Sequence, residues 1–129
     1  MNLLDTCTLL WWTLDPEKLS AKAGRACDRI EQDGAFISSI TIWEIGIKLK
    51  KGVLQFNDSL EGYVHRLDRL GTIEVIPVDE KIWMENLNLD WGHRDPVDRT
   101  IVATAKLRGL SIITKDRIIR EYYPHVIWM

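Results

Sequence analysis

Apolar positions along the chain follow two patterns: short runs that are apolar throughout, and longer runs with apolar residues three or four positions apart. The short runs predict strands buried on both faces, and the longer runs predict amphipathic helices. Glycine, proline and aspartate separate the runs. The predicted strands cover residues 2–5, 35–38, 73–78, 110–114 and, at an edge, 125–128, and the predicted helices cover residues 7–14, 16–32, 39–51, 59–70, 79–88, 95–109 and 115–122.

Strands and helices alternate along the whole sequence. This order predicts a three-layer α/β/α sandwich around a mostly parallel sheet of about five strands. The chain has 129 residues and carries no repeat, low-complexity segment or linker. We therefore expect a single domain over residues 1–129. In such folds the functional groups gather at the carboxyl ends of the strands.

Composition narrows the class of protein without naming a function. Apolar residues make up 46% and charged residues 28% of the chain, which indicates a soluble globular protein. The net charge of −2 offers no basic stripe for nucleic acid. That absence does not exclude nucleic acid, because a bound metal supplies local positive charge.

The two cysteines bear on the compartment. Cys7 and Cys27 have no metal-ligand spacing and fall in apolar helical patterns, so we expect buried free thiols and a reducing cytoplasm. The apolar N-terminal stretch lacks a basic region and a small-residue cleavage site, so it is not expected to be a signal peptide. No apolar run approaches the roughly 18 residues of a membrane span, and we expect no membrane association.

Two acids follow predicted strands. Asp5 ends the first strand, and Asp116 lies two residues after the strand that ends at Thr114. Both side chains are therefore expected at the carboxyl edge of the sheet. The alternative for each is a purely structural role, since an aspartate between a strand and a helix is a good N-cap.

Glu44 lies where an apolar residue is expected. It shares a helix face with Ile40, Trp43 and Ile47 by helical spacing, which calls for a partner for its carboxylate. The alternative is a capping box formed by Thr41 and Glu44, which would start the helix later.

The stretch "HRDPVDRTIVATA" contains two aspartates with different expected roles. Asp95 is a good N-cap, and Pro96 suits the first helical position. Asp98 heads the apolar stripe formed by residues 101, 102 and 105. The alternative for Asp98 is a first-turn acid favoured by the helix dipole.

Four acids brought to one sheet edge would repel one another. At ~4 Å and an effective dielectric constant near 20, each like-charge pair costs about 4 kcal/mol. Such a cluster needs a cation or must bind protons. Oxygen ligands suit Mg²⁺ or Mn²⁺, and a site of that kind can hydrolyse a phosphodiester with a metal-activated water.

Four motifs carry a family resemblance: "LLDT" at Asp5, "SSITIWEIGIKLKKG" around Glu44, "HRDPVDRTIVATA" at residues 93–105, and "LSIITKD" ending at Asp116. In their order and spacing they resemble those of the PIN-domain nucleases, in particular the VapC-like toxins of toxin–antitoxin pairs. The resemblance covers nearly the whole chain.

The resemblance implies an activity and a site. Asp5, Glu44, Asp98 and Asp116 match the family's acidic quartet, which would coordinate Mg²⁺ or Mn²⁺ and activate water in a metal-dependent endoribonuclease. Asp95 belongs to the family's Asp-Pro-hydrophobic-Asp-Arg pattern, in which Val97 here replaces the usual Phe. The hydroxyls of Thr6 and Thr114 match supporting groups beside the site.

The resemblance also implies partners. VapC-like toxins form homodimers, and a small antitoxin covers the active site with its C-terminal segment. The chain has six tryptophans, among them the adjacent Trp11 and Trp12. We expect one of these two to join an apolar groove for a partner; the alternative places both at the edge of the core.

Basic residues near the acidic motifs could position RNA through its phosphates. The candidates are Lys48, Arg94 and Arg99, and the alternative for each is ordinary ion pairing, such as Glu44 with Lys48 on one helix. His93 is expected to be a hydrogen-bonding or surface residue rather than a general base.

Three other functions compete with a nuclease. A non-catalytic PIN-like interaction module is the main alternative, and the complete quartet argues against it. A phosphoacceptor receiver domain needs an adjacent acidic pair after the first strand, where only Asp5 stands. A phosphatase with an aspartyl nucleophile needs a second aspartate two residues later, at the position of Cys7.

Overall fold

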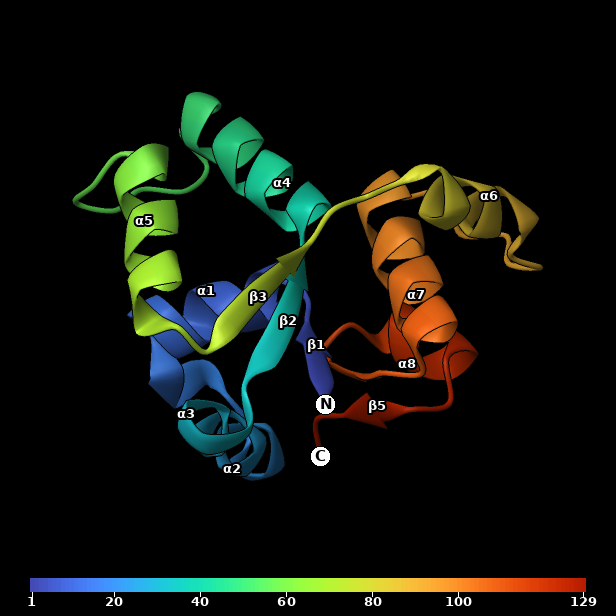
Figure 1. Cartoon of the computed structure of the whole chain (residues 1–129), viewed down its shortest axis with the longest axis horizontal. Coiled ribbons are helices and arrows are strands. Elements are labelled where there is room, and N and C mark those ends of the chain that lie inside the picture. Colours follow the sequence, from blue (N-terminus) through green and yellow to red (C-terminus); the bar gives the residue numbers. More distant parts are fainter.

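The fold is built on one five-stranded sheet in which all neighbouring strands run parallel. The structure is a computed structural model that describes residues 1–129. The strand order is β3-β2-β1-β4-β5, and Figure 1 labels β3, β2, β1 and β5 among these strands. The strands are β1 (Asn2–Leu4), β2 (Ala35–Ser38), β3 (Ile73–Ile76), β4 (Ser111–Ile113) and β5 (Val126–Ile127).

Helices cover both faces of the sheet (Figure 1). They are α1 (Thr6–Leu14), the short 3₁₀ turn η1 (Pro16–Lys18), α2 (Ala21–Asp28), α3 (Ile30–Asp33), α4 (Ser39–Lys50), α5 (Leu60–Leu70), α6 (Glu80–Asn88), α7 (Pro96–Arg108) and α8 (Arg117–Tyr122). The predicted three-layer α/β/α sandwich is confirmed.

Successive residues of the central strands enter opposite cores. Leu3 packs with residues of α6, α7 and α8, whereas Leu4 packs with residues of α1 to α5. The same alternation separates Ile112 from Ile113. All four side chains are fully buried, and each such burial stabilises the fold by about 1.5–3 kcal/mol. Burial on both faces explains why these strands are apolar throughout.

Local chemistry corrects two predictions from the sequence. The single helix predicted over residues 16–32 is wrong: Ser20 caps a new helix by accepting a hydrogen bond from the Ala23 amide, which divides the segment into η1, α2 and α3. The expected burial of Cys7 is also wrong, because α1 begins at Thr6 and exposes this thiol. Cys27 is buried, and both cysteines are free.

No helix in this fold combines the length and the apolar character that crossing a membrane requires.

Candidate active site

A cleft of about 550 Å³ lies at the carboxyl edge of the sheet. Asp5 follows β1, Asp116 follows β4, Glu44 lies in α4, and Asp98 lies in the first turn of α7. All four line the cleft, and so does Asp95. The topology thus brings together the four acids that the sequence singled out, from positions up to 111 residues apart in the chain (116 − 5).

Asp5 is the most buried of these acids, with 7% of its surface exposed. One carboxylate oxygen accepts a hydrogen bond from the Thr8 amide at 2.9 Å, which caps α1. The other oxygen accepts a hydrogen bond from the Thr114 hydroxyl. Burial raises the pKa of Asp5, the two hydrogen-bond donors oppose that rise, and the nearby charge of Asp116 adds to it. Asp5 therefore caps a helix and also lines the cleft.

Asp116 shares this double role. It caps α8 by accepting hydrogen bonds from the amides of Ile118 at 2.8 Å and Ile119 at 3.2 Å. Its own amide donates to the Thr114 hydroxyl at 3.0 Å. Because that hydroxyl donates in turn to Asp5, Thr114 holds the two strand-end acids in a fixed relation.

Glu44 reaches the cleft from a helix that is apolar almost all round. The capping-box alternative is wrong, because α4 begins at Ser39 and Ser38 caps it through the Ile40 amide. The expected burial of Trp43 is also wrong: Thr41 and Ile45 form the buried face, and Trp43 is 58% exposed. Glu44 lies beside this face, is half-buried and lines the cleft.

Thr6 lies at the same edge and is buried. Its hydroxyl donates to the Thr41 hydroxyl at 3.2 Å, which links the start of α1 to α4. Thr6 lines the cleft, whereas Thr114 supports it from behind through Asp5 and Asp116.

Asp98 lies at the start of α7, as predicted, with Asp95 as the N-cap and Pro96 as the first helical residue. Asp95 accepts hydrogen bonds from the amides of Val97 at 2.8 Å and Asp98 at 3.2 Å. Burial raises the pKa of Asp98 to about 6, with smaller contributions from the negative charges of Asp95 and Asp116, against a lowering by a hydrogen bond from His93. A buried carboxylate with a raised pKa is stabilised in its ionised form by a nearby cation.

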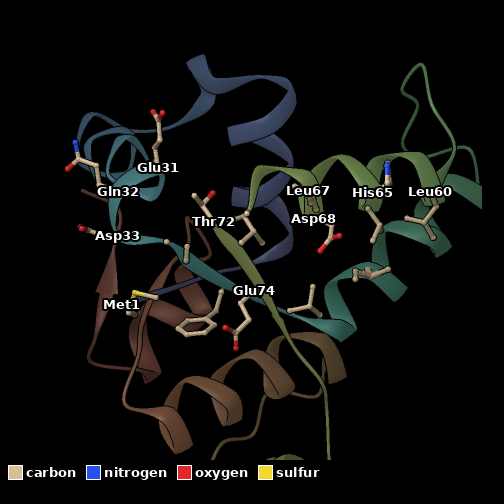
Figure 2. Close-up of a pocket in the computed structure, with 18 of the residues that line it drawn as sticks. Met1, Glu31, Gln32, Asp33, Leu60, His65, Leu67, Asp68, Thr72 and Glu74 are labelled. Carbon is tan, nitrogen blue, oxygen red and sulfur yellow. The ribbon is translucent and has the colours of Figure 1, made fainter.

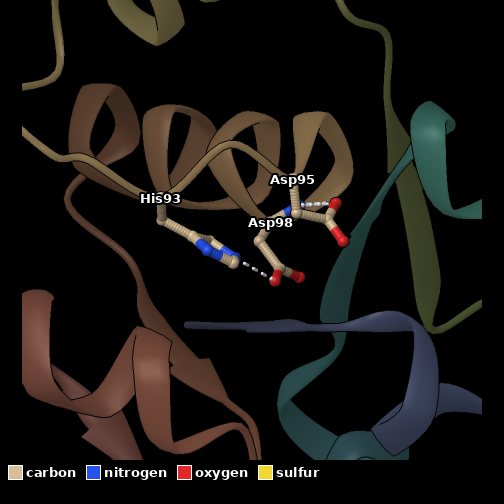
Figure 3. Close-up of side chains that lie close together, drawn as sticks. All are labelled: His93, Asp95 and Asp98. Carbon is tan, nitrogen blue, oxygen red and sulfur yellow. Dashed lines mark hydrogen bonds and ion pairs between the residues drawn. The ribbon is translucent and has the colours of Figure 1, made fainter.

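His93 holds Asp98 directly. Its Nε2 lies 2.8 Å from an Asp98 carboxylate oxygen (Figure 3). The imidazole contacts the Trp91 ring at 4.9 Å between centroids, and Trp91 stacks on Tyr122 at 4.5 Å with 5° between the planes. The prediction of a hydrogen-bonding histidine is confirmed, but its partner and the aromatic stack behind it were not predicted.

Arg99 has a structural role that the sequence did not reveal. Its five N–H groups donate to the Asn86 side chain and to the carbonyls of Asn86, Leu89, Trp91 and His93. A guanidinium has only five donors, so none remains for a phosphate. Arg99 fixes the path of residues 86–93, and with it the position of His93, instead of contacting RNA as considered above.

The cleft offers donors of the kind that a hard divalent ion takes. At the start of α7, ligand atoms of Asp95, Asp98 and His93 lie within 4.8 Å of one another, but His93 does not line the cleft and its Nε2 contacts Asp98 (Figure 3). Asp5, Glu44 and Asp116 line the same cleft with further carboxylates. Five carboxylates together with raised pKa values at two of them fit a Mg²⁺ or Mn²⁺ site.

Three cationic side chains also line the cleft: Lys48, Lys115 and Arg117. The predicted ion pair between Glu44 and Lys48 is absent from the ion pairs of the structure, so the Lys48 ammonium is not held by that acid. Lys115 lies over the Trp11 ring at 5.7 Å. Arg94 is exposed on the loop before α7 and does not line the cleft. The sequence pointed to Lys48 but missed Lys115 and Arg117.

The adjacent tryptophans of α1 point to different surroundings. Trp11 lines the acidic cleft and packs against Trp128, with 5.8 Å between ring centroids. Trp12 lines a small, mostly apolar hollow of about 400 Å³ together with Leu14, Tyr63 and Leu70. Both tryptophans are partly buried and pack at the edge of the core, as the alternative stated, and Trp12 also lines an apolar hollow; its use by a partner stays a prediction.

The fold and the cleft define a class of protein, a parallel α/β domain with an acid-lined cleft at the carboxyl edge of its sheet. The sequence model of the PIN domain matches residues 3–123, and the chain belongs to this family. Ribonuclease VapC22 of Mycobacterium tuberculosis is 25% identical over 130 residues, covering 98% of this chain and 97% of the relative.

Solved structures agree with this family. A toxin-antitoxin complex from Klebsiella pneumoniae has a TM-score of 0.68 at 24% identity and covers 98% of this chain and 95% of its own. FitAcB from Neisseria gonorrhoeae has a TM-score of 0.67 at 25% identity, and the match covers 98% of this chain and 96% of that chain. The resemblance to VapC-like PIN domains stated from the motifs is confirmed, and the receiver and phosphatase alternatives are set aside.

Proposed function

We propose that this protein is a metal-dependent endoribonuclease and the toxin of a toxin–antitoxin pair. The observation that carries the proposal is the convergence of Asp5, Glu44, Asp98 and Asp116 on one cleft of a PIN domain. The similarity to a ribonuclease, which extends over 97% of that relative, supports RNA as the substrate class.

In this proposal four of the acids bind the metal ion, and Asp95 positions one of them. Asp5, Glu44, Asp98 and Asp116 would hold Mg²⁺ or Mn²⁺, with Asp95 and His93 placing Asp98. The ion supplies Lewis acidity, which lowers the pKa of water and neutralises charge on the phosphate. Because burial raises the pKa of both Asp5 and Asp98, a bound cation would favour their ionised forms and compete with protons there.

Positive side chains would position the RNA. Lys48, Lys115 and Arg117 line the rim beside the acids and would contact phosphates. Arg94, exposed on the loop before α7, is the outer candidate. Phosphate contacts fix the register of the strand and carry no base preference, so these residues set affinity rather than target.

An antitoxin would cover both the acidic cleft and the apolar hollow next to it. Trp11 lines the first and Trp12 the second, and the two are adjacent on α1. A segment that wraps around α1 would contact both. The similarity to toxin–antitoxin complexes supports this kind of partner, and the two free cysteines suit the reducing cytoplasm in which such a pair would act.

A second copy of the chain would dimerise through α6. This helix exposes Trp83, Met84 and Leu87, at 44%, 60% and 75% exposure. A cluster of large exposed apolar side chains on one helix marks a protein contact. The homodimer would leave the acidic cleft open, because none of these three residues lines it.

Cleavage of RNA with and without Mn²⁺ tests the proposal against its main alternative, a non-catalytic interaction module. We expect Mn²⁺-dependent cleavage that Asp98→Asn and Glu44→Gln abolish, while Asp90→Asn, an exposed acid outside the cleft, retains it. Unchanged cleavage in Asp98→Asn would remove Asp98 from the site. Absence of cleavage of any RNA by a protein that binds its antitoxin would favour the interaction module.

A further inference from the structure

A second hollow, of about 1200 Å³, runs along the free edge of the sheet and shares no residue with the acidic cleft. β3 is the outermost strand and pairs only with β2. Residues of β2, β3, α4 and α5 line the hollow, as do residues of α3. Figure 2 shows Leu60, His65 and Asp68 on α5 beside the strand, and Glu74 on β3 itself. We call this hollow the β3-edge groove.

The edge of β3 has main-chain groups available for another strand. The Ala35 amide donates to the Thr72 carbonyl at the start of the β2–β3 pair. Alternate residues of a strand face its neighbour, so the main-chain groups of Ile73 and Val75 point to the open side. None of the hydrogen bonds outside the regular elements uses these groups. An exposed edge of this kind is a template for an added strand.

The walls of the groove suit an extended peptide. Ile42, Leu60 and Val64 provide an apolar wall on the α4 and α5 side, and Phe36 lies on the other side of the sheet. Successive side chains of an added strand point to opposite faces, so alternate residues would contact the two walls. The four residues of β3 span about 13 Å, the length of a short strand.

The charge of the groove selects the partner. Five acids line it: Glu31, Asp33, Glu61, Asp68 and Glu74. Asp33 has an ion pair with Arg29 at 3.0 Å, and the other four have none. No lysine or arginine lines the groove. Two cations lie at its margin: Arg29, which is paired with Asp33, and Arg108, which lies over the Phe36 ring at 6.0 Å.

This charge argues against a second copy of the chain at the same place. Pairing of two β3 edges would bring Glu74 and its acidic neighbours against the same acids of the partner, and juxtaposed like charges exclude wrong partners. A basic segment has the opposite effect. We propose that the β3-edge groove binds an extended, basic segment of a partner protein, which joins the sheet as an additional strand beside β3.

A peptide of alternating arginine and valine, about seven residues long, is the probe. We expect it to shift the NMR signals of the Ile73 and Val75 amides and to slow their hydrogen exchange. The same peptide with alternate amides N-methylated keeps its side chains but loses main-chain donors. We expect its affinity to be lower by a factor of about ten or more.

Charge reversal in the protein provides the second arm. We expect the double variant Asp68→Lys with Glu74→Lys to weaken peptide binding about tenfold, with a smaller effect at high salt. The matched control, Asp28→Lys with Asp90→Lys, changes two exposed acids outside the groove and should bind like the wild type.

Three results would overturn the proposal. Shifts confined to amides around Asp5 and Asp116 would place the peptide in the acidic cleft. Equal affinity of the N-methylated peptide would exclude strand addition. If sedimentation showed that the peptide dissociates a dimer of the protein, the groove would be assigned to a second copy of the chain. None of these measurements depends on ribonuclease activity.

Discussion

Replacing Asp98 by asparagine should stabilise the metal-free protein at neutral pH, although it removes a residue proposed to hold the metal. The folded-state pKa of Asp98 is about 6, against an ordinary value of 3.8. The folded protein therefore binds this proton more tightly than the unfolded chain does. Because of that preference, stability falls as the pH rises from about 4 to about 6, and it stays lower above that window.

The size of the effect follows from the shift. A pKa shift of about two units corresponds to about 3 kcal/mol of folding free energy before solvent screening is taken into account. The Asp98 side chain is 20% exposed, and the α7 dipole favours its charge, so screening and the dipole reduce the expected penalty to about 1–2 kcal/mol. Asparagine keeps the shape and an oxygen that can accept a hydrogen bond from His93, without the charge.

Urea unfolding at pH 4 and pH 7.5, in the presence of a chelator, measures this difference. We expect wild type and Asp98→Asn to be equally stable near pH 4, and the variant to be about 1–2 kcal/mol more stable at pH 7.5, a rise in Tm of a few degrees. Adding Mn²⁺ should reverse the order by stabilising the wild type. Asp90→Asn is the matched control. A stability difference that does not change with pH would refute the reasoning.

Three further predictions concern groups around the acids. Arg99→Lys should lower stability by about 1–3 kcal/mol in urea unfolding, because a single ammonium cannot satisfy five acceptors, whereas Arg94→Lys should leave stability unchanged; equal stability would remove Arg99 from the loop support. Thr114→Val should weaken Mn²⁺ binding, followed by calorimetry, about tenfold or more, since it frees Asp5 and Asp116 from their common hydroxyl; Thr104→Val, a buried threonine away from the cleft, is the control. His93→Phe should keep the contact with Trp91 but lower Mn²⁺ affinity about tenfold, because it removes the hydrogen bond to Asp98. His93→Gln should restore part of the lost affinity. Wild-type affinity in His93→Phe would show that Asp98 needs no hydrogen-bond partner at this position.

The sequence predicted the layers, the strand positions and the four cleft acids, because these depend on local pattern. A strand buried on both faces is apolar throughout, and a helix that follows it starts with a cap. Both signals lie within a few neighbouring residues. The segment over residues 16–32 shows the limit: a serine at position 20 is tolerated in a helical pattern, and only its role as a cap reveals the break.

The support of the site could not be predicted in the same way. Arg99 acts through carbonyls of residues 86–93, whose position depends on how α6 packs against α7. The contact of His93 with Asp98 depends in turn on that loop and on the stack of Trp91 with Tyr122. On α4, apolar residues at nearly every position left the buried face ambiguous, and Trp43 was assigned to the wrong side.

The acids of the cleft show why a structural role and a functional role were not alternatives. Asp5, Asp95 and Asp116 each cap a helix with one carboxylate oxygen. A cap fixes the side chain at the start of a helix, and in this topology the starts of α1, α7 and α8 meet at the carboxyl edge of the sheet. The capping oxygen orients the carboxylate while the second oxygen stays available, or accepts from Thr114 in the case of Asp5. Helix starts also favour negative charge, which offsets part of the repulsion between the acids in the metal-free protein. The same local chemistry that begins three helices therefore builds the floor of the proposed metal site.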